Sequence, residues 1–401
     1  MSGEKKKHNK RGLFMKKVLK IFGIILLILA AIAVIVYFSV LRYPNLKTDP
    51  TVGKWYRVET SEMKSSDGSA YHALFKKGDE NKVLVYFAGG GVSINEDTAK
   101  YDSYNTTLVW PDLLANLTMN MGGLCADGEE NPFYDWTMIL FPYATGDFHC
   151  GTGEFEYTDT DGKTKTLYHN GYINFTSAMD EILEKAGLED VDTVVVTGYS
   201  AGGWGAAILA NDVFTAYFPK AESKTVLVDS SVALYDGWAD VAANVWQAPE
   251  HIVNRIKTNN LTLDSLTALY EDYGDEVNIL FCCSTRDGDL AKIQRYFNDL
   301  VFDSDGEMPV DEADGDAFET ILAEFVSHLK EQTNASVFIF DGYDWYGREI
   351  NLTSHTIIAT PYVFAELNDT GKSIAEWLSD AIYGDSADYG LALLYNEKGR
   401  R

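Results

Sequence analysis

Ser200 stands at the apex of a predicted strand, tight turn and helix. The β-branched run at residues 193–197 predicts a buried strand, and the small residues that follow the serine predict a helix. Gly198 and Gly202 lie two residues to either side of Ser200. Such glycines let a strand and a helix crowd together, so that the strained turn exposes the serine hydroxyl above the sheet. The pattern indicates a nucleophilic serine, and a turn that merely permits close packing is the alternative.

A serine hydroxyl is a weak nucleophile near neutral pH, so it needs a histidine base whose orientation a carboxylate fixes. Three histidines follow Ser200 in the chain. His251 lies at a predicted helix start, and His328 lies at the polar end of an amphipathic helix. His355 follows the last strongly apolar run, on a predicted loop, and is therefore the best candidate for the base.

The acid of such a site is expected on a loop after a strand that follows the serine. The apolar run at residues 277–283 leads into STRDGD, which offers Asp287 and Asp289. We favour Asp287, and Asp289 stays open as the alternative acid or as a cap of the next helix. Asp229 also ends a predicted strand, but only one unit after the serine, and is interpreted as a supporting or structural residue.

When a serine attacks a carbonyl carbon, backbone amides must stabilise the negative charge that develops on the carbonyl oxygen. Ala201, directly after the serine, supplies one of them. The sequence YFAGGGVS places Gly89, Gly90 and Gly91 after an early predicted strand, where further amides are needed. A glycine triplet could also form a plain turn or a phosphate loop, but no GxxxxGK[ST] sequence follows, which disfavours phosphate.

Short apolar runs alternate with helical patterns through most of the chain. The runs occupy residues 83–88, 136–141, 193–198, 224–229, 277–283 and 336–341. Their uninterrupted apolar character is typical of strands buried on both faces, as in a parallel sheet covered by helices. Helical spacing occupies residues 172–188, 201–218 and 290–300. The alternation predicts a single α/β domain with a doubly wound, mostly parallel sheet.

Two polar segments and the cysteines bear on metal binding. Residues 158–165, TDTDGKTK, contain an Asp-Gly turn and predict an exposed hairpin. The acidic segment at residues 303–319 lacks the spacing of an EF-hand and is interpreted as a solvated loop entering a helix. No pair among the four cysteines has zinc-site spacing, and a Cys125–Cys150 disulfide stays open. We expect neither a metal nor a cofactor.

The N-terminus predicts a membrane anchor. Residues 21–41 contain no charge and are long enough to cross the roughly 30 Å hydrocarbon layer as a helix. Residues 1–20 carry a net charge of +7, which keeps them cytoplasmic by the positive-inside rule and places the rest outside. A cleaved signal peptide is the alternative, although its A-x-A sequence, at residues 31–33, lies inside the apolar run. We expect a cytoplasmic tail at residues 1–20, an anchor at 21–41, a stalk or entry segment at 42–60 and a catalytic domain at 61–401.

The charge of the chain is unevenly divided. The whole chain carries −27, so residues 21–401 carry −34. An exterior domain this acidic argues against nucleic acid or polyanion partners, and solubility alone is a sufficient explanation of the charge. With 401 residues, 46% of them hydrophobic, the chain can bury a large core.

Taken together, the motifs resemble those of the pectin acetylesterase/Notum family of serine esterases, which has an α/β-hydrolase-like fold. The similar segments, in family order, are YFAGGGVS at 86–93, NPFYDWTMILFPYATGDFHCG at 131–151, GYSAGGWGA at 198–206, VLVDSS at 226–231 and SHTII at 354–358. The resemblance implies triad positions for Ser200, Asp287 and His355. It also implies that Gly90, Gly91 and Ala201 form the oxyanion hole.

The resemblance implies a function as well. Plant members of the family remove acetyl groups from pectin, and Notum removes a palmitoleoyl group from a Wnt serine. We therefore expect a bacterial, membrane-anchored serine carboxylesterase with an extracellular catalytic domain and an O-acetylated glycan as first-choice substrate. A longer-chain deacylase or lipase, and a non-catalytic surface module that binds glycan or lipid, are the alternatives.

Two departures from the family pattern bear on the substrate. The family loop often reads GGGWC or GGWYC, whereas here Val92 follows the glycines, and the cysteines of eukaryotic members are largely missing. Loss of the aromatic residue leaves the wall of the acyl pocket, and so the acyl-chain length, open. Asp147 and His149 match a family segment near the site and are expected to be structural or substrate-facing rather than catalytic.

Overall fold

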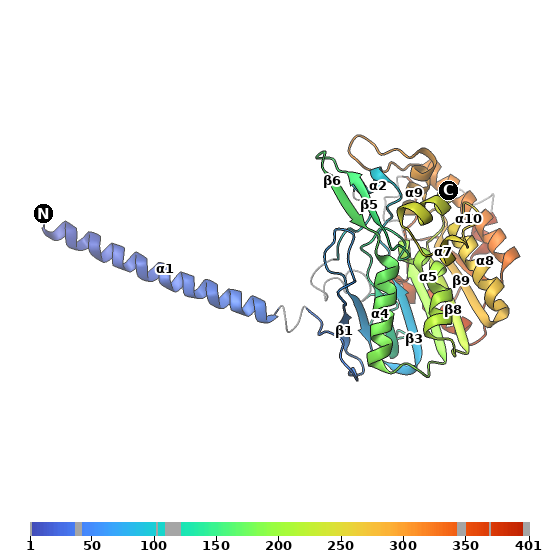
Figure 1. Cartoon of the computed structure of the whole chain (residues 1–401), viewed down its shortest axis with the longest axis horizontal. Coiled ribbons are helices and arrows are strands. Elements are labelled where there is room, and N and C mark those ends of the chain that lie inside the picture. Colours follow the sequence, from blue (N-terminus) through green and yellow to red (C-terminus); the bar gives the residue numbers. More distant parts are fainter. Residues whose placement is uncertain are drawn as a thin grey trace. The chain divides into compact units, whose positions relative to one another are not determined.

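The computed structural model describes residues 2–36, 42–101, 103–108, 122–342, 350–368 and 370–395. The chain divides into two compact units. One contains residues 1–44 with 109–116, and the other contains residues 45–108 with 117–401. The long helix α1 (Ser2–Val36) belongs to the first unit, and the strands belong to the second (Figure 1).

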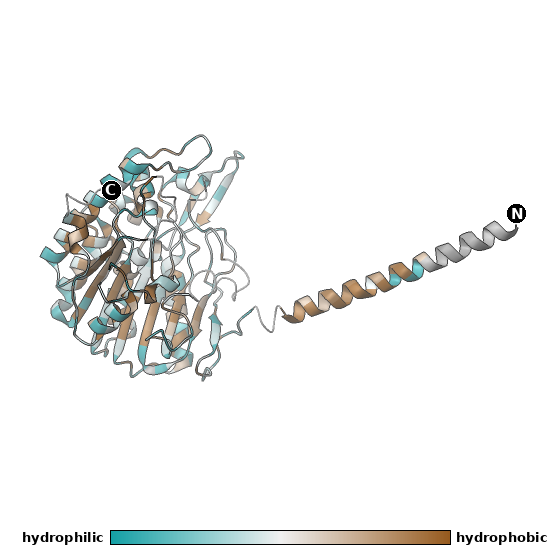
Figure 2. Cartoon of the chain, turned by 180° about the vertical axis from the view of Figure 1, so that it is seen from behind, coloured by the Kyte–Doolittle hydropathy of each residue, from teal (hydrophilic) through white to brown (hydrophobic). Residues whose placement is uncertain are grey.

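Helix α1 carries the apolar segment that the sequence singles out. Met15–Val36, 22 residues, is long and apolar enough to cross a membrane, although a signal sequence meets the same criteria. The large apolar side chains that are exposed in this helix lie between Met15 and Val36, and the ribbon of this segment is coloured mostly hydrophobic in Figure 2. A helix that is apolar all round is normally buried in protein or in lipid. The predicted span at 21–41 overlaps this segment at 21–36, and residues 37–41 lie outside the described residues.

An eight-stranded sheet forms the centre of the second unit (Figure 1). Its strand order is β1 (Trp55–Val58), β2 (Ala73–Lys76), β4 (Trp136–Phe141), β3 (Asp79–Phe87), β7 (Thr193–Tyr199), β8 (Ser223–Asp229), β9 (Val277–Ser284) and β10 (Ser336–Phe340). Strands β4, β3, β7, β8, β9 and β10 pair in parallel, whereas β1 and β2 add an antiparallel edge. The predicted α/β fold with a mostly parallel sheet is confirmed.

The predicted elements agree closely with the observed ones. Each predicted strand overlaps an observed strand to within one residue at either end, except that β3 begins at Asp79, four residues earlier. The register of β3 shifts between Asp79 and Val83. The first four residues of this strand are polar, so the apolar run in the sequence begins only at Val83. The predicted helices correspond to α4 (Gly171–Ala186), to α5 (Ala201–Asp212) with the π-helical turn η2 (Val213–Tyr217), and to α9 (Gly288–Asp299).

Helices cover both faces of the sheet. Helix α5 packs on β7 and β8 and against α8 (Leu261–Tyr273), and α10 (Glu312–Gln332) extends this layer. Phe325 of α10 packs against Phe281 of β9 at a ring distance of 4.7 Å. Helix α11 (Ile374–Ile382) lies on the other face, where Trp377 packs against Phe338. Shorter helices are α2 (Glu96–Lys100), α6 (Trp238–Asp240), η3 (Val241–Val245), α7 (Glu250–Val253), η4 (Gly274–Glu276), η5 (Pro361–Phe364) and α12 (Leu391–Tyr395).

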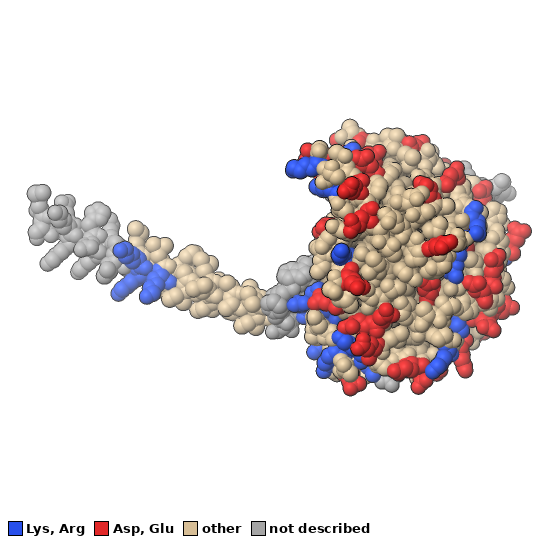
Figure 3. Space-filling model, in the orientation of Figure 1, with Lys and Arg blue, Asp and Glu red and all other residues tan. Residues whose placement is uncertain are grey.

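The two polar segments form the structures that the sequence predicts. Strands β5 (Glu154–Thr158) and β6 (Thr164–Tyr168) make a hairpin whose turn is closed by the Gly162 amide donating to Asp159 O at 2.8 Å. The acidic segment runs as an irregular loop into α10, where Asp311 caps the helix N-terminus. Acidic side chains outnumber basic ones on the face of this unit shown in Figure 3, as the net charge requires.

The strand order fixes where a site can form. Strands β4 and β7 lie on opposite sides of β3, so the direction in which the chain adds strands reverses at β3. Ligands of open parallel sheets bind beyond the carboxyl ends of the strands at such a reversal. The glycine triplet follows β3, and Ser200 follows β7, so both emerge at this point.

Candidate active site

The turn at Ser200 has the conformation that its flanking glycines allow. Ser200 has φ 53° and ψ −130°, a strained backbone for a residue with a side chain. A Cβ on Gly198 would collide with the Gly202 carbonyl, and one on Gly202 would collide with the Phe87 carbonyl of β3. Strand and helix therefore approach so closely that neither flanking position accepts a side chain.

Hydrogen bonds to β8 and the segment after it hold this turn. The Ser200 amide donates to Asp229 O at 2.9 Å, and the Ser231 hydroxyl donates to Ser200 O at 2.7 Å. Ala201 is the first residue of α5, where amides lack intrahelical acceptors. The Ala201 amide is thus available at the edge of the pocket that Ser200 lines.

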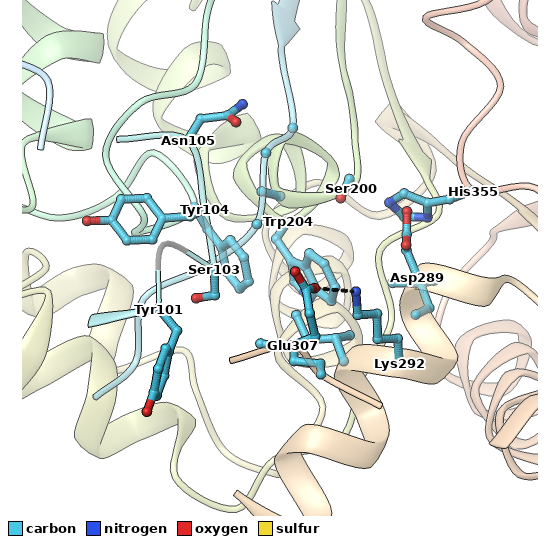
Figure 4. Close-up of a pocket in the computed structure, with 18 of the residues that line it drawn as sticks. Tyr101, Ser103, Tyr104, Asn105, Ser200, Trp204, Asp289, Lys292, Glu307 and His355 are labelled. Carbon is cyan, nitrogen blue, oxygen red and sulfur yellow. Dashed lines mark ion pairs between the residues drawn. The ribbon is translucent and has the colours of Figure 1, made fainter. Parts of the chain in front are cut away.

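His355 and Asp287 are in direct contact. The Nδ1 atom of His355 lies 2.8 Å from Oδ2 and 2.9 Å from Oδ1 of Asp287. Asp287 is fully buried and caps α9, because its Oδ1 accepts from the amides of Asp289 and Leu290. These bonds fix the carboxylate, which in turn orients the ring. Ser200 and His355 line one pocket and lie next to each other in Figure 4.

Asp229 supports the loop that carries His355. Its Oδ2 accepts from the amides of Ile357 and Ile358 at 2.7 and 2.9 Å, and the Ser230 hydroxyl donates to its Oδ1 at 2.9 Å. The buried carboxylate therefore joins the end of β8 to the segment just after the histidine. This is the supporting role that its place in the sequence predicts.

Charge strongly affects the protonation of His355. Burial by itself would lower the pKa of the imidazole, but the charge of Asp287 and the hydrogen bond to it prevail. With smaller contributions from the charges of Asp289 and Asp229, they raise the pKa of His355 to about 9. Burial also raises the pKa of Asp287, and His355 opposes this effect. Asp289 lies beside the ring at the pocket wall (Figure 4).

The glycine loop passes directly against the serine turn. A Cβ on Gly89 would lie 2.6 Å from the Ser200 Cβ. The Gly90 carbonyl accepts from the Asn105 amide at 2.8 Å, and Gly91 has φ 85°. Because the C=O and N–H of a trans peptide point in opposite directions, this bond turns the Gly91 amide away from Asn105. Gly89, Gly90, Gly91 and Ala201 all line the pocket beside Ser200.

The pocket has a volume of about 490 Å³ and an aromatic wall. The rings of Phe148 and Trp204 stack there at 4.6 Å and 6°. Across the pocket, Lys292 pairs with Glu307 at 3.7 Å (Figure 4). The sequence pattern around Phe148, Lys292 and Glu307 carries no signal of a place in this pocket. For Trp204 a signal existed, since it lies one helical turn after the serine, but its direction depends on the tertiary packing of α5.

Several residues singled out in the sequence lie away from the pocket. Val92 is fully buried and is not among the residues that line the pocket. Asp147 and His149 are also buried, in keeping with a structural role. His251 pairs with Asp212 at 3.0 Å near the surface, and His328 lies on the exposed side of α10. All four cysteines are buried free thiols, so Cys125 and Cys150 are not bridged.

Comparison with known proteins identifies the family that the chain resembles. Residues 56–244 match the family model of pectinacetylesterases. The fold is similar to two crystal forms of the Wnt deacylase Notum from Drosophila, each with 16% identity and a TM-score of 0.57. Each match covers 86% of this chain and 96% of the Notum chain. Among curated proteins, none matches. The family resemblance inferred from the motifs is confirmed.

Proposed function

Because the chain carries a pectinacetylesterase domain with a Notum-like fold, we propose that it is a serine carboxylesterase acting through Ser200, His355 and Asp287. The family match indicates an acyl esterase or deacylase. The observation that carries the proposal is the 2.8 Å contact between His355 Nδ1 and a buried Asp287, in a pocket that Ser200 shares. The side chains of Ser200, His355 and Asp287 come from segments far apart in the sequence, and the fold brings them together.

The reaction begins when His355 accepts the hydroxyl proton of Ser200. The Nδ1 proton of the ring is held by Asp287, which leaves Nε2 as the base. The serine oxygen bonds to the ester carbonyl carbon, the C–O bond to the alcohol breaks, and Nε2 returns the proton to the departing alkoxide. Water, deprotonated by the same nitrogen, then attacks the acyl-enzyme and releases the carboxylic acid and Ser200.

The glycine loop stabilises the charge of both tetrahedral intermediates. Each step moves a full negative charge onto the former carbonyl oxygen. Gly90, Gly91 and Ala201 line the pocket together with Ser200, and in this proposal their amides donate to this oxygen. Fixed amides stabilise such a charge without reorganising during the reaction.

We take an acetyl ester, with an O-acetylated glycan as its alcohol part, as the first-choice substrate. The polar side chains of Ser103, Asn105 and Tyr101 at the pocket edge suit a hydroxyl-rich leaving group. The stacked Phe148 and Trp204 favour the second candidate, hydrolysis of longer acyl chains, because they extend an apolar wall beyond the serine. A pocket of about 490 Å³ accommodates either group.

A chain-length series tests both candidates. Residues 43–401 and the Ser200→Ala variant are assayed with p-nitrophenyl esters from acetate to palmitate. We expect hydrolysis that Ser200→Ala loses by about 10⁴-fold or more, fastest with acetate. A maximum at long chains favours the deacylase. Equal rates for the wild type and Ser200→Ala would instead favour a non-catalytic binding module.

We also propose that the esterase acts outside the cytoplasm. The basic residues before the apolar segment of α1 favour retention of the N-terminus inside, with the sheet-containing unit outside. An ester substrate outside the cell, and a membrane contacted through α1, are then the partners. The acidic surface of this unit disfavours nucleic acid.

A further inference from the structure

Two consecutive residues near the glycine loop have a strained backbone. Phe148 has φ 50° and His149 has φ 61°, although neither is a glycine. Each such residue costs about 1–3 kcal/mol and persists only where its surroundings hold it in place. Both residues are buried, and they belong to the segment that connects β4 to β5 along the chain. Specific contacts must therefore hold Phe148 and His149 in this conformation.

The buried carboxylate of Asp147 holds the strained pair. Its Oδ1 accepts from the His149 amide at 3.1 Å, and its Oδ2 accepts from the amides of Gly151 and Gly171 at 3.1 and 2.8 Å. The Phe148 amide donates to the Tyr143 hydroxyl at 3.0 Å. Burial raises the pKa of Asp147 to about 6, and these hydrogen bonds oppose that effect. Both strained residues are thus tied through their amides.

The strained pair directs two side chains to two parts of the candidate site. Phe148 reaches the pocket, where it stacks on Trp204. The His149 ring packs against Phe87 and Tyr143, at ring distances of 5.0 and 4.9 Å. Its Nε2 lies 2.9 Å from the carbonyl oxygen of Ala88, the residue directly before the glycine triplet. Since a carbonyl only accepts, Nε2 carries the proton of this bond.

The protonation state of His149 suits a fixed donor rather than a base. Burial lowers the pKa of the ring to about 4, so the imidazole is neutral at working pH. Its one proton lies on Nε2 and is committed to Ala88 O. The ring does not line the pocket, so it does not touch the reacting atoms.

We propose that His149 is a positioning residue that fixes the oxyanion loop through the Ala88 carbonyl. The proposal rests on the esterase function proposed above. Three successive glycines have more backbone freedom than any other tripeptide, so their amides need anchoring to stay aimed at one point. Ala88 O, held by His149, and Gly90 O, held by the Asn105 amide, anchor the loop on both sides of Gly89. Fixed amides stabilise the transition state without reorganisation.

The test compares two side chains of similar size at position 149. His149→Gln keeps an N–H donor, whereas His149→Met removes it. The same two substitutions at His169 serve as matched controls. His169 is also a fully buried histidine with one carbonyl partner, Thr145 O at 3.0 Å, but it does not contact Ala88. For each variant, kcat, KM and affinity for a trifluoromethyl ketone, which forms an oxyanion adduct with Ser200, are measured.

We expect His149→Met to lower kcat about 10- to 100-fold, the range of a small displacement of catalytic groups, with KM changed little. Affinity for the trifluoromethyl ketone should fall by the same factor as kcat, and His149→Gln should restore most of both. The proposal is overturned if the Gln and Met variants lose kcat equally, or if the His169 variants lose as much. It is also overturned if only KM changes.

If the position-149 variants fold poorly, the variant Tyr143→Phe tests the proposal instead. Tyr143→Phe deletes only the hydroxyl that accepts from the Phe148 amide, so it loosens the strained pair from a distance. We expect it to lower kcat and ketone affinity together, and unchanged values would count against the proposal. Failure of the esterase function would be seen separately, as a wild type no faster than Ser200→Ala.

Discussion

At the scale of single residues, the two carboxylates around His355 differ in their contacts. Asp287 contacts the ring nitrogen at 2.8 Å from a fully buried position, whereas Asp289 lies at the pocket wall. A buried carboxylate on Nδ1 selects the tautomer in which Nε2 is free to act as a base. The charge of Asp289 adds a smaller contribution to the raised pKa of His355. The two acids should therefore have distinguishable effects on catalysis.

The first prediction compares Asp287→Asn with Asp289→Asn. We expect Asp287→Asn to lower kcat about 10⁴-fold, because an amide can stabilise the wrong tautomer. Asp289→Asn should lose less than about tenfold, since charge at the wall tunes the ring and does not orient it. Steady-state kinetics with p-nitrophenyl acetate measure both. A larger loss in Asp289→Asn would show that Asp289 is the triad acid.

The second prediction concerns pH. Only the deprotonated form of His355 is a base, and Asp287 raises the pKa of the ring to about 9 against the effect of burial. We therefore expect kcat/KM to rise with pH along a limb centred well above 6.5, and Asp289→Asn to move this limb to lower pH. A pH–rate profile of the wild type and the variant measures it. A wild-type limb centred at or below 6.5 would contradict the raised pKa.

At the scale of elements, the site depends on how closely β3, β7 and α5 approach one another. Gly198 and Gly202 leave no room for a Cβ, and the glycine loop after β3 passes against the Ser200 turn. The parallel register places Phe87, the last residue of β3, opposite Gly198. The serine and the candidate oxyanion amides are thus brought together by strand pairing.

The third prediction is that Gly202→Ala destabilises the fold as well as the site. Its methyl group would collide with the Phe87 carbonyl, so strand and helix must separate, at a cost of about 3 kcal/mol. Gly187→Ala is the control, because it meets only strain from a positive φ and costs about 1 kcal/mol. Urea unfolding measures both. Equal destabilisation would mean that the close approach at the turn is unimportant for stability.

At the scale of the whole molecule, a strongly acidic esterase unit is joined to a basic, apolar helix. The large apolar side chains of Met15–Val36 are exposed, and such a helix is stable only in lipid or against other protein. The basic residues before it favour insertion with the N-terminus inside. Retention of this helix would keep the protein at the membrane, whereas its cleavage would release the acidic unit.

The fourth prediction is that the full chain stays in the membrane fraction after an alkaline wash, whereas residues 43–401 are soluble and equally active. The reason is the free energy gained when the uncharged residues 21–41 enter lipid. Fractionation, activity assays and N-terminal sequencing of the mature protein measure it. A soluble mature protein that begins after residue 33 would identify a cleaved signal peptide instead.

Much of the fold was predictable because its signals are local. Apolar runs such as those of β4 and β7 identify buried parallel strands, and the glycines around Ser200 identify the close turn between strand and helix. The antiparallel edge, β1 and β2, carried no such signal, because each strand has only four residues and its burial comes from neighbours distant in the sequence.

The sequence by itself determined the order of the strands along the chain, the types of the candidate catalytic residues and the apolar N-terminal segment. Each of these depends on residues that are neighbours in the sequence. Only the tertiary structure decided which aspartate contacts Nδ1 of His355, since Asp287 and Asp289 are two residues apart at the start of α9. It also decided that Phe148 and Trp204 wall the pocket and that His149 bonds to Ala88 O. These contacts join segments far apart in the chain, and only packing brings them together.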